Sequence, residues 1–243
     1  MKNQNWITPD WPAPPNVRAL ITTRGGGVSL GPYASMNPAD HVGDEPQAVT
    51  ANRALLRAAL PSEPFWLKQI HSEIVAEAGV GPVEADACIA RAAKQVCAVL
   101  TADCLPVLFC AADGSVVGAA HAGWRGLCAG VLERTIAAMG IPGAQILAYL
   151  GPAIGPRAFE VGPEVRDAFI ALDDAATDAF VPHANGKYLA DLYLLARQRL
   201  ARLGVTQVSG GAECTYRDVE RFFSYRRDGV TGRMASLVWI DPV

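Results

Sequence analysis

The sequence predicts a single α+β domain in which helices flank mixed β-sheets. Predicted strands cluster in the middle of the chain, and no regular alternation of strand and helix runs through it, which disfavours a doubly wound parallel fold. No Ser/Gly-rich linker or internal repeat divides the 243 residues, so we expect one domain over residues 1–243. A chain of this length buries roughly 70–75% of its unfolded surface, which supports a core without disulfides.

The N-terminal part is expected to begin with an extended lead-in over residues 1–16, because prolines crowd Pro9–Pro15. Alternation of apolar and polar residues predicts a strand after it, followed by a glycine-rich loop. A helix is expected to end before Pro61, since proline does not continue a helix. The expected elements are a strand over Val17–Thr23, a helix over Pro46–Leu60, and short strands over Phe65–Ile70 and Ile74–Ala76.

Short apolar runs separated by turn residues fill the middle of the chain and are typical of buried strands. Apolar positions at helical spacing predict helices in the second half. The expected strands are Cys97–Leu100, Leu105–Cys110, Val116–Ala120, Ile146–Leu150, Val205–Ser209 and Met234–Ile240. The expected helices are Gly126–Met139, Val165–Leu172 and Leu189–Leu203.

The charge and hydropathy of the chain exclude several classes of protein. The formal net charge is −3, and the largest Lys/Arg cluster is Arg226–Arg227, which we expect in a solvated turn with Asp228. Nucleic acids and anionic membranes require concentrated positive charge, so neither partner is expected. The first residues show no secretory signal pattern, and the longest apolar stretch, Val96–Ala112, is too short and too polar to span a membrane. We therefore expect a cytoplasmic protein, either a monomer or a weak homodimer.

Six cysteines and only four histidines are available for metal or nucleophile chemistry. In a reducing cytoplasm the cysteines are thiols, and no Cys-x-x-Cys motif marks a zinc ribbon or a redox site. His71, Cys104 and His121 each lie at the end of a predicted strand, and they converge if these strands share a sheet edge. Two histidines and a cysteine with a free fourth position suit catalytic zinc, while thiolate with imidazole also suits copper. The alternative is ordinary packing, since free cysteines are usually buried.

Charged residues next to glycines add further candidates. Asp103 is surrounded by apolar residues, where a carboxylate is costly unless it is paired or used in catalysis. Trp124 and Arg125 lie between two glycines that let the backbone pass close to a ligand. Near the N-terminus, Arg24 precedes three glycines, which suits either an anion-binding loop or a mobile hairpin turn.

Six stretches of the chain together form a recognisable pattern. They are Gly31–Asn37, Lys68–Ser72, Thr101–Val107, His121–Gly126, Gly151–Gly155 and Phe223–Asp228. The pattern resembles the bacterial laccase-domain family, whose members have been called polyphenol oxidases, peptidoglycan-editing factors and purine nucleoside phosphorylases. The resemblance extends from about Thr22 to Ile240, nearly the whole chain, so it is far more specific than any single motif.

The resemblance implies an α+β fold with mixed sheets, distantly similar to a bacterial toxin deamidase that has a Cys/His site. It implies that His71, Cys104 and His121 ligate a metal ion, with zinc expected and copper as the alternative. The implied activity is phosphorolysis of adenosine, inosine, guanosine and methylthioadenosine, together with deamination of adenosine. A small-molecule nucleoside and phosphate are therefore the expected partners.

These two reactions need different groups. Deamination needs a hydroxide, and a three-ligand zinc ion lowers the pKa of its bound water to about 7. Phosphorolysis needs cations such as Arg24 or Arg125 to hold the phosphate dianion. Asn37 and Gln69 are candidates for hydrogen bonds to substrate or water. Asp103 is expected either as a general acid or base or as a residue that orients a ligating histidine.

Three other functions fit parts of the pattern. A copper-dependent polyphenol oxidase of the multicopper kind needs many histidine ligands, and four histidines are too few for it. A metal-free cysteine hydrolase would use Cys104 as the catalytic nucleophile with His71 or His121 as its base. A peptidoglycan-editing hydrolase would remove a misincorporated serine from a muramyl nucleotide. The zinc-dependent nucleoside enzyme is our first hypothesis, and the cell-wall role is the second.

Overall fold

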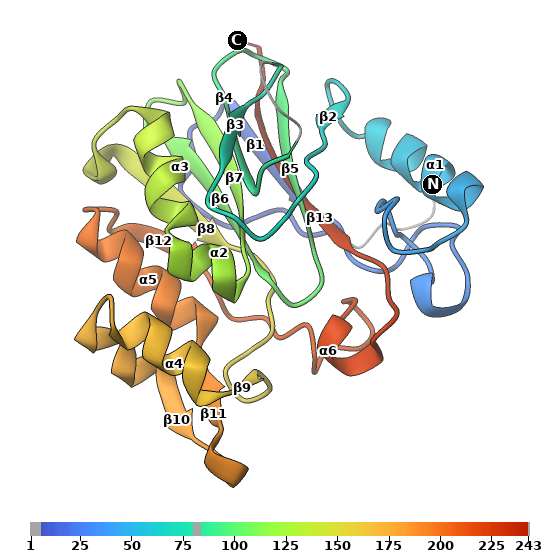
Figure 1. Cartoon of the computed structure of the whole chain (residues 1–243). Coiled ribbons are helices and arrows are strands. Elements are labelled where there is room, and N and C mark those ends of the chain that lie inside the picture. The colour runs from blue at the N-terminus through green and yellow to red at the C-terminus, as the bar shows by residue number, and fades with distance from the viewer. Residues whose placement is uncertain (1–5, 80–83, 243) are drawn as a thin grey trace.

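The described strands form two large sheets and one small sheet (Figure 1). A computed structural model of the chain describes residues 6–79 and 84–242. The strand orders are β1-β13-β5-β2 in a four-stranded sheet, β12-β8-β6-β7-β4-β3 in a six-stranded sheet and β10-β11-β9 in a three-stranded sheet. The strands are β1 Val17–Ile21, β2 Pro64–Phe65, β3 Val75–Glu77, β4 Ala87–Ala90, β5 Val96–Thr101, β6 Leu105–Ala111, β7 Val117–Ala122, β8 Ile146–Leu150, β9 Glu160–Val161, β10 Phe180–Pro182, β11 Tyr188–Ala190, β12 Gln207–Gly210 and β13 Met234–Ile240. The helices are α1 Pro46–Arg57, α2 Trp124–Ala129, α3 Val131–Met139, α4 Pro163–Ile170, α5 Leu192–Arg202 and α6 Tyr225–Asp228.

The central strands are apolar along their whole length because both faces of the six-stranded sheet are covered. In β6, Leu108 and Cys110 belong to the core between the two large sheets. The intervening residues Val107 and Phe109 belong to the core beneath α3 and α5. This alternation is the period of two that a strand imposes on its side chains. Figure 1 shows α2–α5 gathered on this side of the molecule and α1 on the opposite side.

The predicted α+β class with mixed sheets in a single domain is confirmed. Parallel and antiparallel pairs coexist in both large sheets, for example β2 with β5 and β13 with β5. The described part of the expected lead-in is attached to β1, because Ile7 and Ile21 exchange backbone hydrogen bonds of 2.8 and 2.9 Å. Residues 1–5 of that lead-in lie outside the described residues. Within the described ranges, no helix combines the length and the hydropathy that crossing a membrane requires.

Several predicted boundaries were wrong. The helix expected over Gly126–Met139 is two helices, because Gly130 adopts a left-handed φ of 107° that ends α2 before α3 begins. The strand expected over Phe65–Ile70 is reduced to β2, which ends at Phe65, and to an isolated bridge between Lys68 and Glu84. The helix expected from Leu189 begins at Leu192, where Asp191 caps it by accepting a hydrogen bond from the backbone N–H of Leu194.

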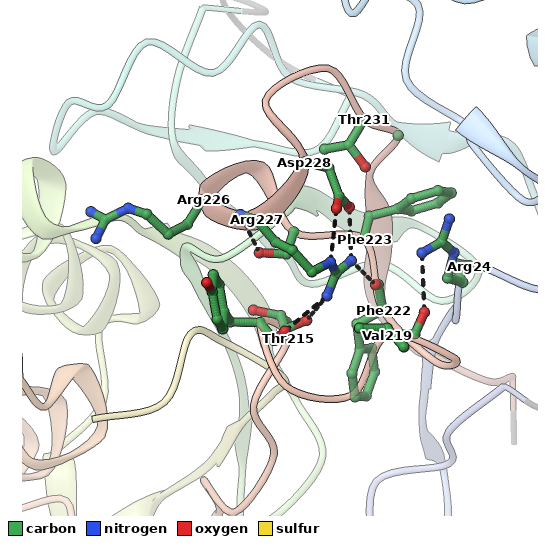
Figure 2. A network of polar contacts seen from close by, with 12 residues as sticks. Arg24, Thr215, Val219, Phe222, Phe223, Arg226, Arg227, Asp228 and Thr231 are labelled. Atoms are coloured by element: carbon green, nitrogen blue, oxygen red, sulfur yellow. Dashed lines mark hydrogen bonds and ion pairs between the residues drawn. The ribbon is translucent and has the colours of Figure 1, made fainter. Parts of the chain in front are cut away.

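The prediction of a solvated turn at Arg226–Asp228 was wrong in part, since Arg226 and Asp228 are exposed as expected. These residues belong to α6, and the Arg227 side chain is only 16% exposed. Figure 2 shows its guanidinium donating to the backbone carbonyls of Thr215 and Phe222 and pairing with Asp228. An arginine in this position satisfies carbonyls that no strand or helix partner reaches. Arg227 therefore fastens α6 to the preceding loop.

We expect Arg227→Ala to lower the free energy of unfolding by about 2–4 kcal/mol, because charged hydrogen bonds are lost and buried carbonyls are left unpaired. Urea denaturation measures this quantity. Arg134→Ala, which removes an exposed arginine from α3, is the matched control and should change it by less than about 0.5 kcal/mol. Equal stability of the two variants would contradict the fastening role of Arg227.

Candidate metal centre

Three sequence-predicted residues converge at one end of the stacked sheets. The ligand atoms of His71, Cys104 and His121 all lie within 4.8 Å of one another. Cys104 Sγ is 3.9 Å from His71 Nε2, and the two imidazole rings meet edge to face with centroids 4.8 Å apart. These three side chains form a group able to hold a metal ion.

Strand pairing brings two of the three together. The antiparallel register of β6 and β7 pairs Leu105 with Ala122, so Cys104, one residue earlier, lies beside Gly123. His121 is the residue of β7 opposite Pro106. His71 comes from the loop between β2 and β3 rather than from a strand end, which corrects the expectation for this residue. Its backbone has a φ of 63°, a left-handed conformation.

A buried carboxylate that the sequence analysis missed holds the two histidines in place. Asp86 is fully buried, and its Oδ1 lies 2.8 Å from Nδ1 of His121. Because that ring nitrogen is engaged, His121 offers Nε2 to a metal ion. A carboxylate behind a ligating histidine is the usual means of fixing its tautomer and raising its basicity. The signal in the sequence was Asp86 itself, an acidic residue directly before the apolar run Ala87–Ala90.

The same carboxylate also orders the loop that carries His71. Asp86 accepts hydrogen bonds from the backbone N–H groups of Ile70, His71 and Ser72 at 2.6–3.1 Å. It also accepts one from the Ser72 hydroxyl at 2.8 Å. Consecutive N–H groups that point at one anion form a nest, which requires a left-handed residue such as His71 within it. Asp86 therefore determines the positions of both histidines.

The electrostatics of the group favour the anionic forms of Cys104 and Asp86. Burial by itself would raise the pKa of Cys104, but His121 and His71 outweigh it and lower the pKa to about 6. Burial would likewise raise the pKa of Asp86, but hydrogen bonds from His121 and Ser72 lower it to about 2. Thiolate and carboxylate are thus both available near neutral pH, and the thiolate is the metal-binding form of cysteine. Burial by itself would lower the pKa of His121, but Cys104 and Asp86 outweigh it and raise the pKa to about 9, so a metal ion has to displace a proton from this imidazole.

Close backbone approach makes the convergence possible. A Cβ atom on Gly123 would lie 2.9 Å from Cys104 Sγ and 3.1 Å from Cδ2 of His71. A Cβ on Gly126 would lie 2.8 Å from the carbonyl oxygen of Ser72. Both glycines that flank Trp124–Arg125 are therefore needed so that α2 can pack against the candidate ligands and their loop.

The donor set and its spacing fit a tetrahedral metal ion. Zinc–nitrogen and zinc–sulfur bonds of about 2.0–2.3 Å place tetrahedral ligand atoms roughly 3.4–3.7 Å apart. The separation of 3.9 Å between Cys104 Sγ and His71 Nε2 is close to that value. The three side chains line a cavity of about 430 Å³, from which a fourth ligand could reach an ion that they held. The cavity is also lined by His41, Gln69, Leu100, Thr101, Ala102, Tyr225 and Arg233.

Asp103, a predicted catalytic residue, is held by hydrogen bonds from two distant parts of the chain. It lies in the turn between β5 and β6 with a φ of 86°, and it is 8% exposed. Its carboxylate accepts hydrogen bonds of 2.6 Å from the Thr215 hydroxyl and from the backbone N–H of Arg226. Asp103 thus ties the turn before Cys104 to the segment that carries α6. Within the described residues, Asp103 forms no hydrogen bond with His71 or His121.

Of the four predicted substrate-binding residues, Gln69 lines the metal-centre cavity, whereas Arg24, Asn37 and Arg125 do not. The amide of Gln69 also exchanges hydrogen bonds of 2.7 and 2.8 Å with the backbone of Leu100. Asn37 is fully buried and accepts a hydrogen bond from the backbone N–H of Arg233. Arg24 donates to the Val219 carbonyl and lies over the Phe223 ring, as Figure 2 shows.

The remaining predicted cation, Arg125, is exposed and lies over the Trp124 ring with its guanidinium carbon 4.5 Å from the ring centroid. Arg233, which the sequence analysis missed, does line the metal-centre cavity and is half-buried. Its distance of 112 residues along the chain from His121 left no local signal. Only the pairing of β13 with β5 brings it to this place.

The fold and the site define a class of α+β proteins with a His–Cys–His group at the end of two stacked sheets. The profile of the family described as "Multi-copper polyphenol oxidoreductase laccase" matches residues 18–241. This chain therefore belongs to the laccase-like polyphenol oxidoreductase family.

Its relatives include proteins named as nucleoside enzymes. The chain is 57% identical over 239 residues to the purine nucleoside phosphorylase YfiH of Escherichia coli, covering 96% of this chain and 98% of that protein. It is 56% identical over 238 residues to a purine nucleoside phosphorylase of Pseudomonas aeruginosa, covering 97% and 98%. Among solved structures, a Neisseria meningitidis protein superposes with a TM-score of 0.94 at 55% identity, covering 98% of this chain and 100% of that one. YlmD of Geobacillus stearothermophilus superposes with a TM-score of 0.89 at 28% identity, covering 100% and 98%.

We expect Asp86→Asn to weaken zinc binding by roughly 10–100-fold, because the substitution removes the charge behind His121 while preserving the size of the side chain. Competition with a chromophoric chelator measures the affinity, and circular dichroism checks that the variant is folded. Asp113→Asn, which changes an exposed aspartate in a turn, is the matched control. A folded Asp86→Asn protein with wild-type zinc affinity would refute this role.

Proposed function

We propose that this chain is a zinc-dependent purine nucleoside phosphorylase acting on adenosine, inosine, guanosine and methylthioadenosine, and that it also deaminates adenosine. One observation carries the proposal: a carboxylate-backed His–Cys–His group opens into a cavity of about 430 Å³. The names of relatives that are 56–57% identical over nearly the whole chain support it. In the proposal, His71, Cys104 and His121 hold the metal ion.

Zinc, when bound, supplies a Lewis acid that generates hydroxide from water at neutral pH. The residues of the chain would orient the ligands and bind the substrate. Asp86 keeps His121 in one tautomer through the hydrogen bond at Nδ1. A cavity of this volume is within the usual range for a small-molecule ligand. The exposed aromatic ring of Tyr225 lines it and offers a face on which a purine can stack.

Phosphate attacks C1′ of the ribose on the face opposite the leaving base and needs a cation to hold it there, and the cavity offers Arg233. One guanidinium nitrogen of Arg233 donates to the carbonyls of Thr231 and Gly232, which fixes the group. Burial lowers the pKa of Arg233, yet an arginine stays charged in proteins. Because its charge is permanent and its orientation is fixed, this guanidinium is suited to bind a phosphate dianion. We therefore assign phosphate binding to Arg233.

The other predicted site residues stay predictions. Arg24 would have to leave the Ala34 and Val219 carbonyls to reach a phosphate ion. Asn37 would have to leave its buried hydrogen bonds, and Gln69, although it lines the cavity, would have to leave the backbone of Leu100. Arg125 is exposed and does not line the cavity. Catalytic roles for Asp103 and Cys104 also remain part of the proposal.

Copper is the one alternative metal that a specific observation favours. Thiolate with two imidazoles suits copper as well as zinc. The description of the matching family also names copper. A multicopper centre needs more histidines than this single three-residue group, which is the one found in the described residues. The metal-free hydrolase and the peptidoglycan-editing hydrolase stay alternatives. Cytoplasmic location is part of our proposal, and it accords with the six cysteines of the chain, which are all free thiols.

We expect the zinc-loaded protein to release hypoxanthine from inosine only when phosphate is present. Removal of zinc with a chelator should abolish the release, and added zinc should restore it. Chromatography of the bases and of ribose 1-phosphate measures both products. Hydrolysis without phosphate, activity insensitive to the chelator, or phenol oxidation that tracks copper loading would each overturn the proposal.

We expect Arg233→Gln to raise the KM for phosphate by about tenfold or more, because a lost charged contact is worth about 1.5–3 kcal/mol. The KM for inosine should change much less, since the nucleoside carries no charge. Steady-state kinetics with each substrate varied in turn separates the two constants. Arg125→Gln is the comparison that tests the sequence-based assignment, and a larger phosphate effect there would transfer the role to Arg125.

A further inference from the structure

A second cavity lies apart from the metal centre. Its volume is also about 430 Å³, and it shares no lining residue with the cavity at His71, Cys104 and His121. Its walls come from the segments that follow β8 and β12 and from the first turns of α5. Nothing in the proposed reaction uses it.

The cavity has the location at which open sheets bind ligands. β8 and β12 are parallel neighbours, paired from Leu147 with Gln207 to Leu150 with Gly210. The lining residues of the two segments follow the carboxyl ends of these strands. Ligands of α/β sheets bind in crevices outside the carboxyl ends of parallel strands, where the connecting segments leave the sheet.

Positive charge dominates the walls. Arg157 and Arg217 line the cavity from opposite segments and are exposed. Within residues 6–79 and 84–242, neither guanidinium has a hydrogen bond or ion pair to a protein group. Arg197 donates to the carbonyls of Val208 and Gly210 at 2.9 and 2.7 Å, so its charge is fixed at the end of β12 without a carboxylate partner.

The carboxylates of the cavity are already engaged. Glu213 receives hydrogen bonds of 3.0–3.1 Å from the guanidinium of Arg221. Asp191 caps α5 by accepting a hydrogen bond of 3.0 Å from the backbone N–H of Leu194. Arg221 therefore compensates the charge of Glu213, and Asp191 alone cannot offset Arg157, Arg197 and Arg217 together. The cavity therefore has an excess of positive charge that an anion can compensate.

The floor of the cavity is backbone held in one conformation. Gly211 has a φ of 84°, and a Cβ atom there would lie 3.2 Å from both the Arg197 guanidinium and the Tyr193 ring. The backbone N–H of Gly155 donates to Cys214 Sγ at 3.3 Å, which joins the two segments. A preformed floor reduces the entropy lost when a ligand binds.

We propose that this cavity binds a small phosphate- or carboxylate-bearing anion between Arg157 and Arg217. Guanidinium groups bind both kinds of anion through paired N–H donors. Such an anion would contact the segment that includes Thr215, whose hydroxyl donates to Asp103 beside the candidate ligand Cys104. The inference does not depend on the reaction at the metal centre.

The test uses the full-length, zinc-loaded protein and three probes: AMP, ribose 5-phosphate and glutarate. Isothermal titration calorimetry at physiological ionic strength gives affinity and stoichiometry for each. The first two probes carry a phosphate and the third carries only carboxylates, so the titrations distinguish the sources of the shared chemistry. The variants are Arg157→Gln/Arg217→Gln, the matched control Arg18→Gln/Arg134→Gln at exposed positions elsewhere, and Arg233→Gln at the metal centre.

We expect at least one probe to bind once per chain. Its affinity for the Arg157→Gln/Arg217→Gln protein should be lower by about tenfold or more. Its affinity should be unchanged in the control pair and in Arg233→Gln. The proposal is overturned if no probe binds, if the Arg157→Gln/Arg217→Gln protein binds like the wild type, or if only Arg233→Gln weakens binding.

Discussion

The buried Asp86 carboxylate is the constraint on which the candidate metal centre depends. Its hydrogen bond to Nδ1 of His121 and those from the 70–72 loop join parts of the chain that are 14–35 residues away from it. A fully buried carboxylate is tolerated only when it is paired or hydrogen-bonded, so the loop and β7 must stay where they are. The centre is thereby preorganised by a residue that does not itself point a ligand atom at the metal position.

The two stacked sheets provide the rigid support for this arrangement. Residues of β6 pack into cores on both faces of the six-stranded sheet, so that strand cannot shift without disturbing two layers. Its register with β7 places Cys104 beside Gly123. Cys104 and His121 are held in place by these paired strands. His71 lies on a loop, and its hydrogen bond to Asp86 holds it instead.

The segment from Gly211 to Arg233 connects the features outside the sheets. Its first residues line the second cavity, Thr215 holds Asp103, and Arg227 fastens α6 to the carbonyls of the same segment. Tyr225 and Arg233 then line the cavity of the metal centre. This irregular segment thus lines both cavities, and its hydrogen bonds to distant residues hold it in that position.

The sequence by itself determined the α+β class, most of the strands and the His71–Cys104–His121 group, because continuous apolar runs encode burial locally and the motifs are contiguous. Only the tertiary structure decided the partner of His121, the break at Gly130 and the choice of Arg233 over Arg24 as the cation in the cavity. These depend on strand register and on hydrogen bonds between residues far apart in the chain. Local periodicity carries no information about such partners, since it specifies which side chains are buried but not what they meet.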